Sequence, residues 1–399
     1  MSAETPSALS APFLAGFMAL GVLVGISTGI AKVVLPLYAA ALHATPAQIG
    51  LVGGLQFAGM LLLSLPLGAM IDRNGSRLLF RIGCIGAALL FLFWLSRADS
   101  PWHLIVGVTL LGLLNPFRVV TMQAEFLQLL PQLGLGKAGW RRASQTFGLN
   151  FAGPTLGAFL LGVAGYGNTF VLVAIGLLLT ALLGERVLSA SPSASEPDDT
   201  SFLRRLRSQF TVLVERADLR RTMAIEFLGQ AAMSYFTVFV SLLAIQRFHM
   251  PTQQAVGLIT LQGALFVLAL LFAGRRLEAW SESLRYAVAF ALLLLSDTLL
   301  SNPLSPLWLW TAAALLGLGL GLQHVTSIAR FSALTQELGR GRVGGLSTLA
   351  GPGGALTGAV LGGVLNQHFG LLAGFRVLAV LYLLQLVWAL RHLLARRGA

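Results

Sequence analysis

Several titratable side chains lie inside long apolar stretches of this 399-residue sequence, and five of them indicate which chemistry is open to it. They are Lys32, Arg118, Glu226, Asp297 and His324. Charged groups inside a lipid bilayer are costly enough that a functional role is the default interpretation. A cationic side chain can bind an anion, and a carboxylate or an imidazole can take up and release a proton. These residue types therefore predict ion binding and proton exchange.

We expect Lys32, Arg118 and His324 to bind substrate, and Glu226 or Asp297 to carry a proton. Each role has a plainer alternative. Lys32 would extend its amine toward the outer membrane surface, His324 would be a hydrogen-bonded packing residue, and Asp297 would reach the outer interface. The stretch that contains Lys32 has no acidic residue, which favours an anionic or amphiphilic substrate over a cationic one.

Metal chemistry and covalent catalysis are not indicated. The single cysteine, Cys84, forms no internal disulfide and supplies no metal-ligand cluster, so we expect no metal and no cofactor. The stretch Gly25–Gly29 spells the Gly-x-Ser-x-Gly turn of hydrolases, but that turn follows a strand and these residues lie in an apolar helical stretch. Small residues at a helix contact explain the motif better. We therefore expect that the chain is not an enzyme.

The elements that hold these residues are apolar segments long enough to cross a membrane. The sequence is 56% hydrophobic and only 11% charged, which is too apolar for a soluble protein of this size. A helix needs about 20 apolar residues to cross the roughly 30 Å hydrocarbon layer. Twelve such segments are predicted, at residues 12–41, 47–71, 78–96, 104–129, 143–165, 168–184, 222–246, 253–274, 285–301, 307–334, 343–366 and 371–392. The predicted fold class is therefore all-α and integral to the membrane.

The net charge of +12 is explained by basic loops rather than by a nucleic-acid-binding face. Short cytoplasmic loops of membrane proteins collect Lys and Arg. The basic clusters fall between spans on one predicted side: Arg73, Arg77 and Arg81; Lys137, Arg141 and Arg142; Arg275 and Arg276; Arg340 and Arg342; and Arg391, Arg396 and Arg397. We therefore expect no nucleic-acid partner, a bacterial-type inner membrane as the location, and both termini in the cytoplasm.

A polar segment divides the chain into two halves. Residues Glu185–Arg221 include a run rich in Ser, Pro and acidic residues, which is typical of a solvated linker. Apolar and basic residues then alternate over Phe202–Leu213, which predicts an amphipathic helix on the cytoplasmic membrane surface, or else an extension of the seventh span. The predicted domains are a six-helix bundle at 1–184, the linker at 185–221 and a second six-helix bundle at 222–399.

The two halves contain an internal repeat. Residues Leu110–Leu129 align without a gap on Leu315–Leu334, sharing Leu-Leu-Gly-Leu, Val-Thr, Ala, Phe and a final Leu. The tripeptide Ala-Gly-Pro at 152–154 recurs at 350–352. These matches place the fourth span opposite the tenth and the fifth opposite the eleventh, as expected for a transporter built from two related bundles.

The loop between the second and third spans carries a specific motif. It reads Gly68-Ala-Met-Ile-Asp72-Arg73-Asn-Gly75-Ser-Arg77. This resembles the cytoplasmic signature of the major facilitator superfamily, Gly-x-x-x-Asp-Arg-x-Gly followed by two basic residues. It departs from the signature at Ser76, where the family usually has a basic residue.

The resemblance implies two pseudo-symmetric six-helix bundles around a central cavity, lined by spans one, four, seven and ten, with the halves rocking alternately. It also implies that the loop signature is a latch that holds the outward-facing state. We expect gating roles for Gly68, Asp72, Arg73, Gly75 and Arg77, with Glu125 as a partner of Arg77. Arg330 occupies the repeat position of Glu125, so the halves carry opposite charges at matching sites.

The fifth span contains a second family signature. Gly153-Pro154-Thr-Leu-Gly157-Ala158 resembles the Gly-Pro-x-x-Gly-Gly motif of drug and metabolite antiporters, with alanine in place of the last glycine. The resemblance implies export, and it extends to Arg118, whose counterpart in the antiporters is linked to proton coupling. The plainer interpretation is helix packing by Gly153, Pro154 and Gly157, and in the other half by Gly351 and Pro352.

Together these features predict a proton-coupled secondary transporter of a small organic, anionic or amphiphilic solute that works by alternating access, with export favoured. A proton symporter that imports a carboxylate-bearing compound, such as a siderophore or an organic acid, is the main alternative. A sensor or scaffold with this fold that transports nothing is the second. The expected partners are the solute, protons and the lipid bilayer, and the expected oligomeric state is a monomer.

The topology has a direct test. A cytoplasm-active reporter fused after Ala399, and another inserted within Ser189–Thr200, should both give cytoplasmic signal, because the span count is even and the basic loops lie on one side. A periplasmic signal at either site would contradict the topology.

Overall fold

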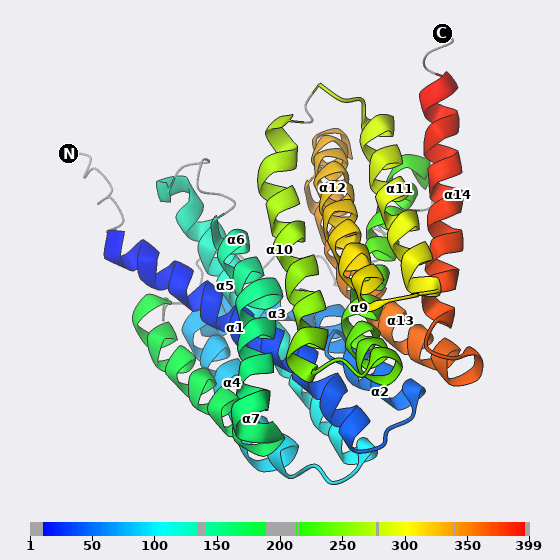
Figure 1. The fold of residues 1–399 in the computed structure, drawn as a ribbon. Helices are drawn as coiled ribbons and strands as arrows, with labels where there is room; N and C mark the ends of the chain where they lie inside the picture. The colour runs from blue at the N-terminus through cyan, green and yellow to red at the C-terminus, as the bar shows by residue number, and fades with distance from the viewer. Residues whose placement is uncertain are drawn as a thin grey trace, which may run out of the picture. The chain divides into compact units, whose positions relative to one another are not determined.

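The computed structural model describes residues 11–133, 140–188, 213, 215–276, 279–338 and 340–395, and every regular element among them is helical (Figure 1). The predicted amphipathic helix at 202–213 lies almost wholly outside the described residues. The helices are α1 (Ala11–Ala41), α2 (Pro46–Leu55), α3 (Ala58–Asn74), α4 (Ser76–Leu89), the π-helix η1 (Leu90–Trp94), the 3₁₀-helix η2 (Leu95–Arg97), α5 (Pro101–Leu133), α6 (Trp140–Phe147), the π-helix η4 (Gly148–Ala152), α7 (Gly153–Val187), α9 (Ala217–Phe248), α10 (Thr252–Arg276), α11 (Glu282–Ser301), α12 (Pro306–Leu338), α13 (Arg340–Phe369) and α14 (Ala373–Ala395).

Ten of the helical segments among the described residues are long and apolar enough to span a membrane. One of them, Ser144–Val187, has 44 residues and contains a break at Gly165, where φ is 71° and ψ is −180°, so it makes two crossings. The 30-residue helix α13 is also long enough to cross. The ten segments, the second crossing after Gly165 and α13 together give twelve crossings in the part of the chain that the structure describes. The all-helical membrane fold predicted from the sequence is confirmed, and its twelve predicted spans agree with this number.

Contacts between residues divide the chain into two compact units. Unit 1 comprises Met1–Val34 and Gly59–Pro197, and unit 2 comprises Leu35–Ala58 and Asp198–Ala399. The segment 35–58 therefore groups with the second half, because α2 packs against α13 and α9. The expected domain bounds at 1–184, 185–221 and 222–399 assign that segment to the first bundle; they remain predictions.

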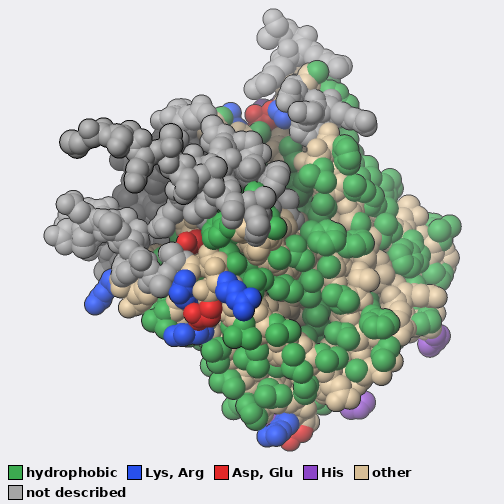
Figure 2. Space-filling view, turned by 90° about the vertical axis from the view of Figure 1, so that its left-hand side faces the viewer, with side chains coloured by type: hydrophobic (Ala, Val, Ile, Leu, Met, Phe, Trp, Pro, Cys, Tyr) green, Lys and Arg blue, Asp and Glu red, His purple; other side chains and the backbone are tan. Residues whose placement is uncertain are grey.

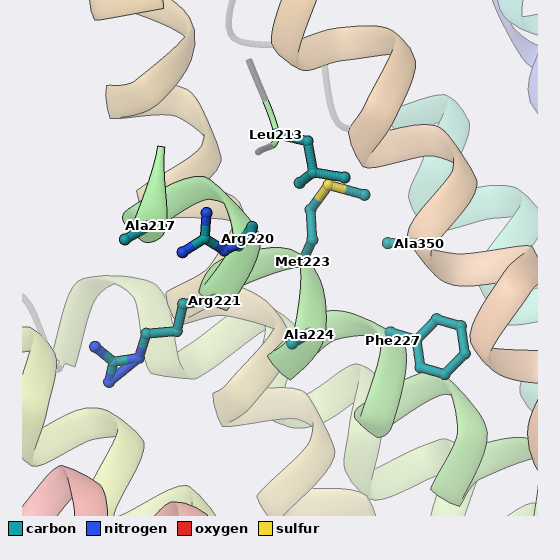
Figure 3. Close-up of a pocket in the computed structure, with 8 residues that line it drawn as sticks. All are labelled: Leu213, Ala217, Arg220, Arg221, Met223, Ala224, Phe227 and Ala350. Carbon is teal, nitrogen blue, oxygen red and sulfur yellow. The ribbon is translucent and has the colours of Figure 1, made fainter. Parts of the chain in front are cut away.

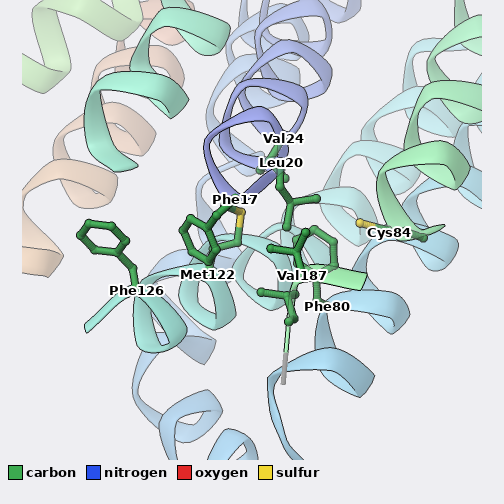
Figure 4. Close-up of a cluster of buried hydrophobic side chains, with 10 residues drawn as sticks. Phe17, Leu20, Val24, Phe80, Cys84, Met122, Phe126 and Val187 are labelled. Carbon is green, nitrogen blue, oxygen red and sulfur yellow. The ribbon is translucent and has the colours of Figure 1, made fainter. Parts of the chain in front are cut away.

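The core of unit 1 is built where α1, α4, α5 and α7 converge. Its buried side chains are Phe17, Leu20 and Val24 from α1, Phe80 and Cys84 from α4, Met122 and Phe126 from α5, and Ala181, Val187 and Leu188 at the end of α7 (Figure 4). Helix α4 packs on both α5 and α7. Cys84 is fully buried here as a small apolar residue.

Unit 2 is arranged around α9. Most residues of α9 are buried, and it packs against α13, α12 and α10. Helix α14 packs on α11, as the red and yellow ribbons in Figure 1 show, and leaves most of its surface exposed. Large apolar side chains such as Leu381, Leu384 and Val387 point outward from α14, as expected for a helix that faces lipid.

Exposed apolar side chains also cover much of the face seen in Figure 2. The described Lys, Arg, Asp and Glu side chains on that face lie toward the edges of this apolar surface. Leu62, Phe93, Phe159 and Leu182 are among the exposed large hydrophobic residues. Patches of this size are unusual on soluble proteins and natural in a hydrocarbon layer.

The connection after the first helix of each half has the same geometry. His43 after α1 and His249 after α9 both adopt positive φ, 58° and 53°. The next residue in each case donates its backbone N–H back into the last helical turn, Ala44 to Ala39 and Met250 to Ala244. Both caps place histidine at the left-handed position; the bonds after α1 follow the Schellman pattern, and those after α9 reach one residue further back along the helix. This extends the internal repeat to the first span of each half, which the sequence alignment did not reach.

Close helix contacts in both units depend on glycine. In unit 1, a Cβ added at Gly153 would lie 2.7 Å from the Cα of Gly29, and one at Gly157 would lie 3.4 Å from the Cα of Ile30. In unit 2 the tight contacts fall at Gly354 and Gly358, which face the backbone of α9, whereas a Cβ at Gly351 would meet only an atom 3.9 Å away. The close packing that the sequence assigned to Gly351 therefore lies three and seven residues further along α13.

A single methyl group tests these contacts. A Cβ at Gly25 would lie 2.8 Å from the backbone nitrogen of Leu149 and 2.9 Å from the Cα of Gly148, so Gly25→Ala should overpack the α1–η4 contact and lower stability by about 1–3 kcal/mol. Thermal unfolding in detergent would show the loss as a lower transition temperature. Gly176→Ala is the matched control, because nothing lies within 4 Å of its added Cβ. An equal or greater loss with the control would contradict the packing argument.

Candidate functional site

Arg118 lies deep in unit 1 on α5, with only 3% of its surface exposed. Its guanidinium donates from Nη1 to the Ser27 hydroxyl on α1 at 2.9 Å and from Nη2 to the Asn115 side-chain oxygen at 3.1 Å. Asn115 lies one turn before Arg118 on the same helix, so the two side chains share a face. Two neutral oxygens, one from each helix, thus hold the guanidinium in place.

Neutral partners leave the charge of Arg118 uncompensated. Among the described residues no Asp or Glu side chain forms an ion pair with Arg118, and its Nε has no hydrogen-bond partner. Lys32 on α1 is partly buried and likewise makes no ion pair or hydrogen bond with the described residues. Unit 1 therefore presents two cationic side chains within its membrane helices, and none of the described ion pairs joins either of them to an acidic residue.

Unit 2 carries the opposite arrangement on α9 and α12. His324 Nδ1 lies 2.8 Å from Glu226 Oε1, and Gln230 donates from Nε2 to the same carboxylate oxygen at 3.0 Å. Glu226 is 6% exposed and His324 8% exposed. The sequence named these two residues for separate roles, and the structure brings them together as a buried pair.

A small cavity adjoins this pair. Its volume is about 10 Å³, enough for one water molecule, and its wall includes Glu226, Gln323, His324 and Phe266. Gln323 donates from Nε2 to the backbone oxygen of Ile225 at 2.7 Å, while its side-chain oxygen is buried without a partner among the described residues. A hydrogen-bond acceptor is thus left open beside the carboxylate–imidazole pair.

Gln323 and Arg118 are equivalent positions of the internal repeat, because the gapless alignment of 110–129 with 315–334 pairs them. Each is buried and reaches from the fourth helix of its half to the first: Arg118 to Ser27 on α1, and Gln323 to Ile225 on α9. One scaffold position therefore holds a cation in unit 1 and a neutral amide in unit 2.

Asp297 is enclosed within unit 2 on α11, with 1% of its surface exposed. The alternative that it reaches the outer interface is wrong, because its side chain is buried within unit 2. Its Oδ2 has no hydrogen-bond partner among the described residues, and neither has the nearby hydroxyl of Tyr382 on α14. Asp297 thus differs from Glu226, whose carboxylate is hydrogen-bonded.

Ion pairs join helix ends within each unit. Arg81 lies 3.2 Å from Glu185, and Arg77 lies 4.0 Å from Glu185 while donating to the Leu188 backbone oxygen at 2.9 Å. These contacts tie α4 to the end of α7. The sequence proposed Glu125 as a partner for Arg77; the structure places Glu185 beside it, and Glu125 itself is buried on α5.

Arg330 holds the corresponding end of unit 2 together. Its Nη2 lies 3.0 Å from Asp218 on α9, and its Nη1 lies 3.9 Å from Glu282 on α11. All three side chains are partly exposed, so each pair adds little stability. Their geometry fixes the ends of α9, α11 and α12 relative to one another.

The loop signature is described only in part. Gly75 adopts φ 78°, which favours glycine, and caps α4 as the turn requires. A Cβ at Gly68 would meet no described atom within 4 Å, so no close helix contact forms there. Arg73 is exposed at the end of α3, and the side chain of Asp72 lies outside the described residues.

An open cleft lies at the start of α9 in unit 2. Its volume is about 640 Å³, and it is lined by Leu213, Ala217, Arg220, Arg221, Met223, Ala224, Phe227 and Ala350 (Figure 3). Arg220 and Arg221 extend away from Phe227 and Ala350, and the guanidinium of Arg221 lies over the Trp388 ring. The cleft therefore has an apolar wall with basic residues along one side.

Asp99, which precedes α5, pairs with His103 in the first turn of that helix, with Asp99 Oδ1 3.2 Å from His103 Nδ1. This hydrogen bond lowers the pKa of the exposed Asp99 carboxyl below its ordinary value. The contact is therefore kept at neutral pH and is lost as pH falls through that lowered pKa. It orders a loop and lies outside both buried sites.

Several functional neighbours were not identified from the sequence. Ser27, Asn115, Gln230 and Gln323 are ordinary polar residues in apolar helices, and nothing in their type marks them as partners. The sequence did contain one signal for two of these neighbours. Asn115 lies three residues before Arg118, and Gln230 lies four residues after Glu226, and residues at these spacings share a helix face.

Long apolar helices in two related bundles, with ionisable groups buried inside, define a polytopic membrane transporter. The chain belongs to the Major Facilitator Superfamily, whose profile matches residues 17–329. Proteins of this family carry small solutes and are not enzymes, so the family and the absence of enzyme activity predicted from the sequence are both confirmed.

Solved structures of this family share the fold. The nucleoside transporter NupG matches with a TM-score of 0.78 at 12% identity, covering 95% of this chain and 98% of that chain, and a mutant of it matches with a TM-score of 0.80, covering 95% and 99%. A nitrite extrusion protein of Bacillus subtilis (strain 168) is 38% identical over 105 residues, which is 26% of this chain and 24% of that relative. The match thus spans about a quarter of the relative's length.

Proposed function

We propose that the protein is a proton-coupled secondary transporter of a small anionic or amphiphilic solute, working by alternating access with export as its direction. The observation that carries this proposal is Arg118, a buried guanidinium whose described partners, Ser27 and Asn115, are both neutral. A buried cation without a countercharge is costly, and an anionic ligand would remove that cost. Lys32 would add a second positive charge from α1.

Neutral partners suit a binding site better than an internal salt bridge would. A carboxylate on Arg118 would have to be displaced before a substrate anion could bind, whereas hydroxyl and amide oxygens orient the guanidinium and leave its charge available. Arg forms planar, directional contacts with carboxylates and similar oxyanions. The expected substrate therefore carries a carboxylate or a comparable small oxyanion.

Three further observations support the substrate class and direction. The matched relative is named for extruding nitrite, a small oxyanion. The cleft of about 640 Å³ at the start of α9, within unit 2, lies in the usual size range of small-molecule pockets, and its apolar wall beside Arg220 and Arg221 suits an amphiphilic anion. The fifth-span motif at Gly153–Ala158 favours export by its resemblance to the antiporters.

The remaining parts of the proposal follow from the sequence. Glu226, Asp297 and Arg118 are the candidates for proton coupling, with His324 at the substrate site or beside it. The inner membrane, cytoplasmic termini, a monomeric state and a latch formed by the loop signature complete the proposed function. Proton symport of a carboxylate-bearing compound into the cell uses the same binding chemistry, and only the direction of transport separates it from export.

Neutralising the cations tests the anion site. A charge-assisted buried contact is worth about 1.5–3 kcal/mol, so Lys32→Gln and Arg118→Gln should each weaken binding of an anion by about tenfold to a hundredfold. Binding of nitrite, of benzoate and of the neutral analogue benzamide to the purified protein would be measured by calorimetry. Benzamide affinity should change much less, because it lacks the charge that these residues hold.

Arg97→Gln is the matched control, since it removes the same charge from an exposed position. Equal and small effects on the charged and neutral probes at both buried positions would mean that the two cations are structural. Uptake into vesicles of known orientation with an imposed pH gradient would then decide direction. If no probe moves and none alters proton flux, transport of this substrate class is excluded.

A further inference from the structure

We propose that Glu226 and His324 form one proton-binding site, and that the coupling proton is held by the pair rather than by either residue alone. In the interior of unit 2, Nδ1 of His324 on α12 lies 2.8 Å from Oε1 of Glu226 on α9. The identity of this proton as the coupling proton rests on the proposed function; the existence of the shared site does not.

The geometry supports a shared proton. A carboxylate and an imidazole at this separation compete for the same hydrogen, so protonation of one changes the other, and the titration belongs to the pair. Without the extra proton, the Nδ1–H of His324 donates to an ionised Glu226 and the pair carries one negative charge. With it, the pair is either a carboxylate with an imidazolium or a carboxylic acid with a neutral imidazole, and its net charge is zero.

The surroundings hold the carboxylate in position without neutralising it. Gln230, one turn along α9, donates to Glu226 Oε1 at 3.0 Å. Gly229 brings α9 close to α12 at this level, since a Cβ there would collide with the side-chain amide of Gln323. The contacts described on this carboxylate include the imidazole of His324 and the neutral amide of Gln230.

The adjoining helices carry several other charged or titratable groups. On α12, Arg330 pairs with Asp218 and Glu282; on α9, Arg221 lies over Trp388. Tyr286 on α11 and Tyr382 on α14 are the titratable groups that lie near enough to sense the charge of Glu226, together with Asp297 near Tyr382. The described residues of α2, α10 and α13 place no charged side chain at this site.

The adjoining cavity supplies a route for the proton. Its volume of about 10 Å³ leaves room for one water molecule, and the unpartnered oxygen of Gln323 on its wall could accept a hydrogen bond from it. A water there donates to Gln323 and lies beside Glu226 and His324, so the proton enters or leaves through it. Gln323 is accordingly a positioning residue for the water, because it carries no proton itself.

Asp297 offers a sharp comparison within the same unit. It is also a buried carboxyl in a membrane helix, but its Oδ2 has neither an imidazole nor an amide partner among the described residues. If burial of an acid were enough to create the proton site, Asp297 and Glu226 would behave alike. The proposal predicts that they differ.

The first experiment needs no substrate. Infrared difference spectra of the purified full-length protein would be recorded across a pH titration for wild type, Glu226→Gln, His324→Gln and Asp297→Asn. The bands lost in Glu226→Gln and in His324→Gln assign the two groups. In the wild type both bands should change at one common midpoint, and each should shift by about 1–3 pH units when the other residue is replaced.

Asp297→Asn should leave the common midpoint unchanged. The proposal is overturned if the Glu226 band titrates at the same pH with and without His324, or if Asp297→Asn rather than His324→Gln shifts it. Because Glu226→Gln preserves shape, a folded variant is expected, and retention of the wild-type elution volume and melting temperature checks this. His324→Asn provides a second, smaller replacement on the other side of the pair.

The second experiment connects the site to transport. Proton and anion sites that are coupled change each other's affinity by about 5–150-fold, so benzoate affinity of the wild type should change by that factor across the titration of the pair. In Glu226→Gln it should vary by less than about twofold, with benzoate exchange retained and gradient-driven accumulation lost. Asp99→Asn, which removes a carboxyl from an exposed position outside both buried sites, should behave as the wild type.

The two results separate the two proposals. A shared titration in the infrared together with no binding of benzoate or nitrite would retain the proton site and reject the proposed substrate class. Anion transport that stays fully proton-coupled in Glu226→Gln would reject the pair as the carrier and leave the proposed function standing.

Discussion

A polar group inside this protein must find its partner within the protein, because the hydrocarbon layer offers none. That constraint explains why Arg118 reaches Ser27 on a neighbouring helix, and why Glu226 is met by both His324 and Gln230. It also explains why glycines recur at the helix contacts. At Gly229, for example, an added Cβ would collide with the side-chain amide of Gln323.

The internal repeat gives the two units one scaffold with different chemistry. The equivalent positions Arg118 and Gln323 are both buried, and each links the fourth helix of its half to the first. In unit 1 this position supplies a cation with neutral partners. In unit 2 it supplies an amide beside the Glu226–His324 pair. Our proposals accordingly assign the anion to one unit and the proton to the other.

Ion pairs in this structure secure helix ends rather than the buried sites. Glu185 joins α7 to α4 through Arg77 and Arg81, and Arg330 joins α12 to α9 and α11. Each partly exposed pair of this kind contributes little to the free energy of unfolding. What these pairs provide is a fixed position of one helix end relative to the next. Each unit is thus tied at its ends, and its buried ionisable groups interact mainly with neutral atoms or with one another.

The sequence by itself determined the membrane class, the helical spans and the family, because apolar length, loop charge and the Gly68–Arg77 motif are local properties. It also identified Arg118 and Glu226, since charge inside an apolar run is visible in one dimension. Only the tertiary structure decided that His324 meets Glu226, that Asp297 is enclosed, and that α2 packs with the second half. Those facts depend on which helix faces come together. A helix with apolar residues on all sides carries no sequence signal for which face meets which neighbour.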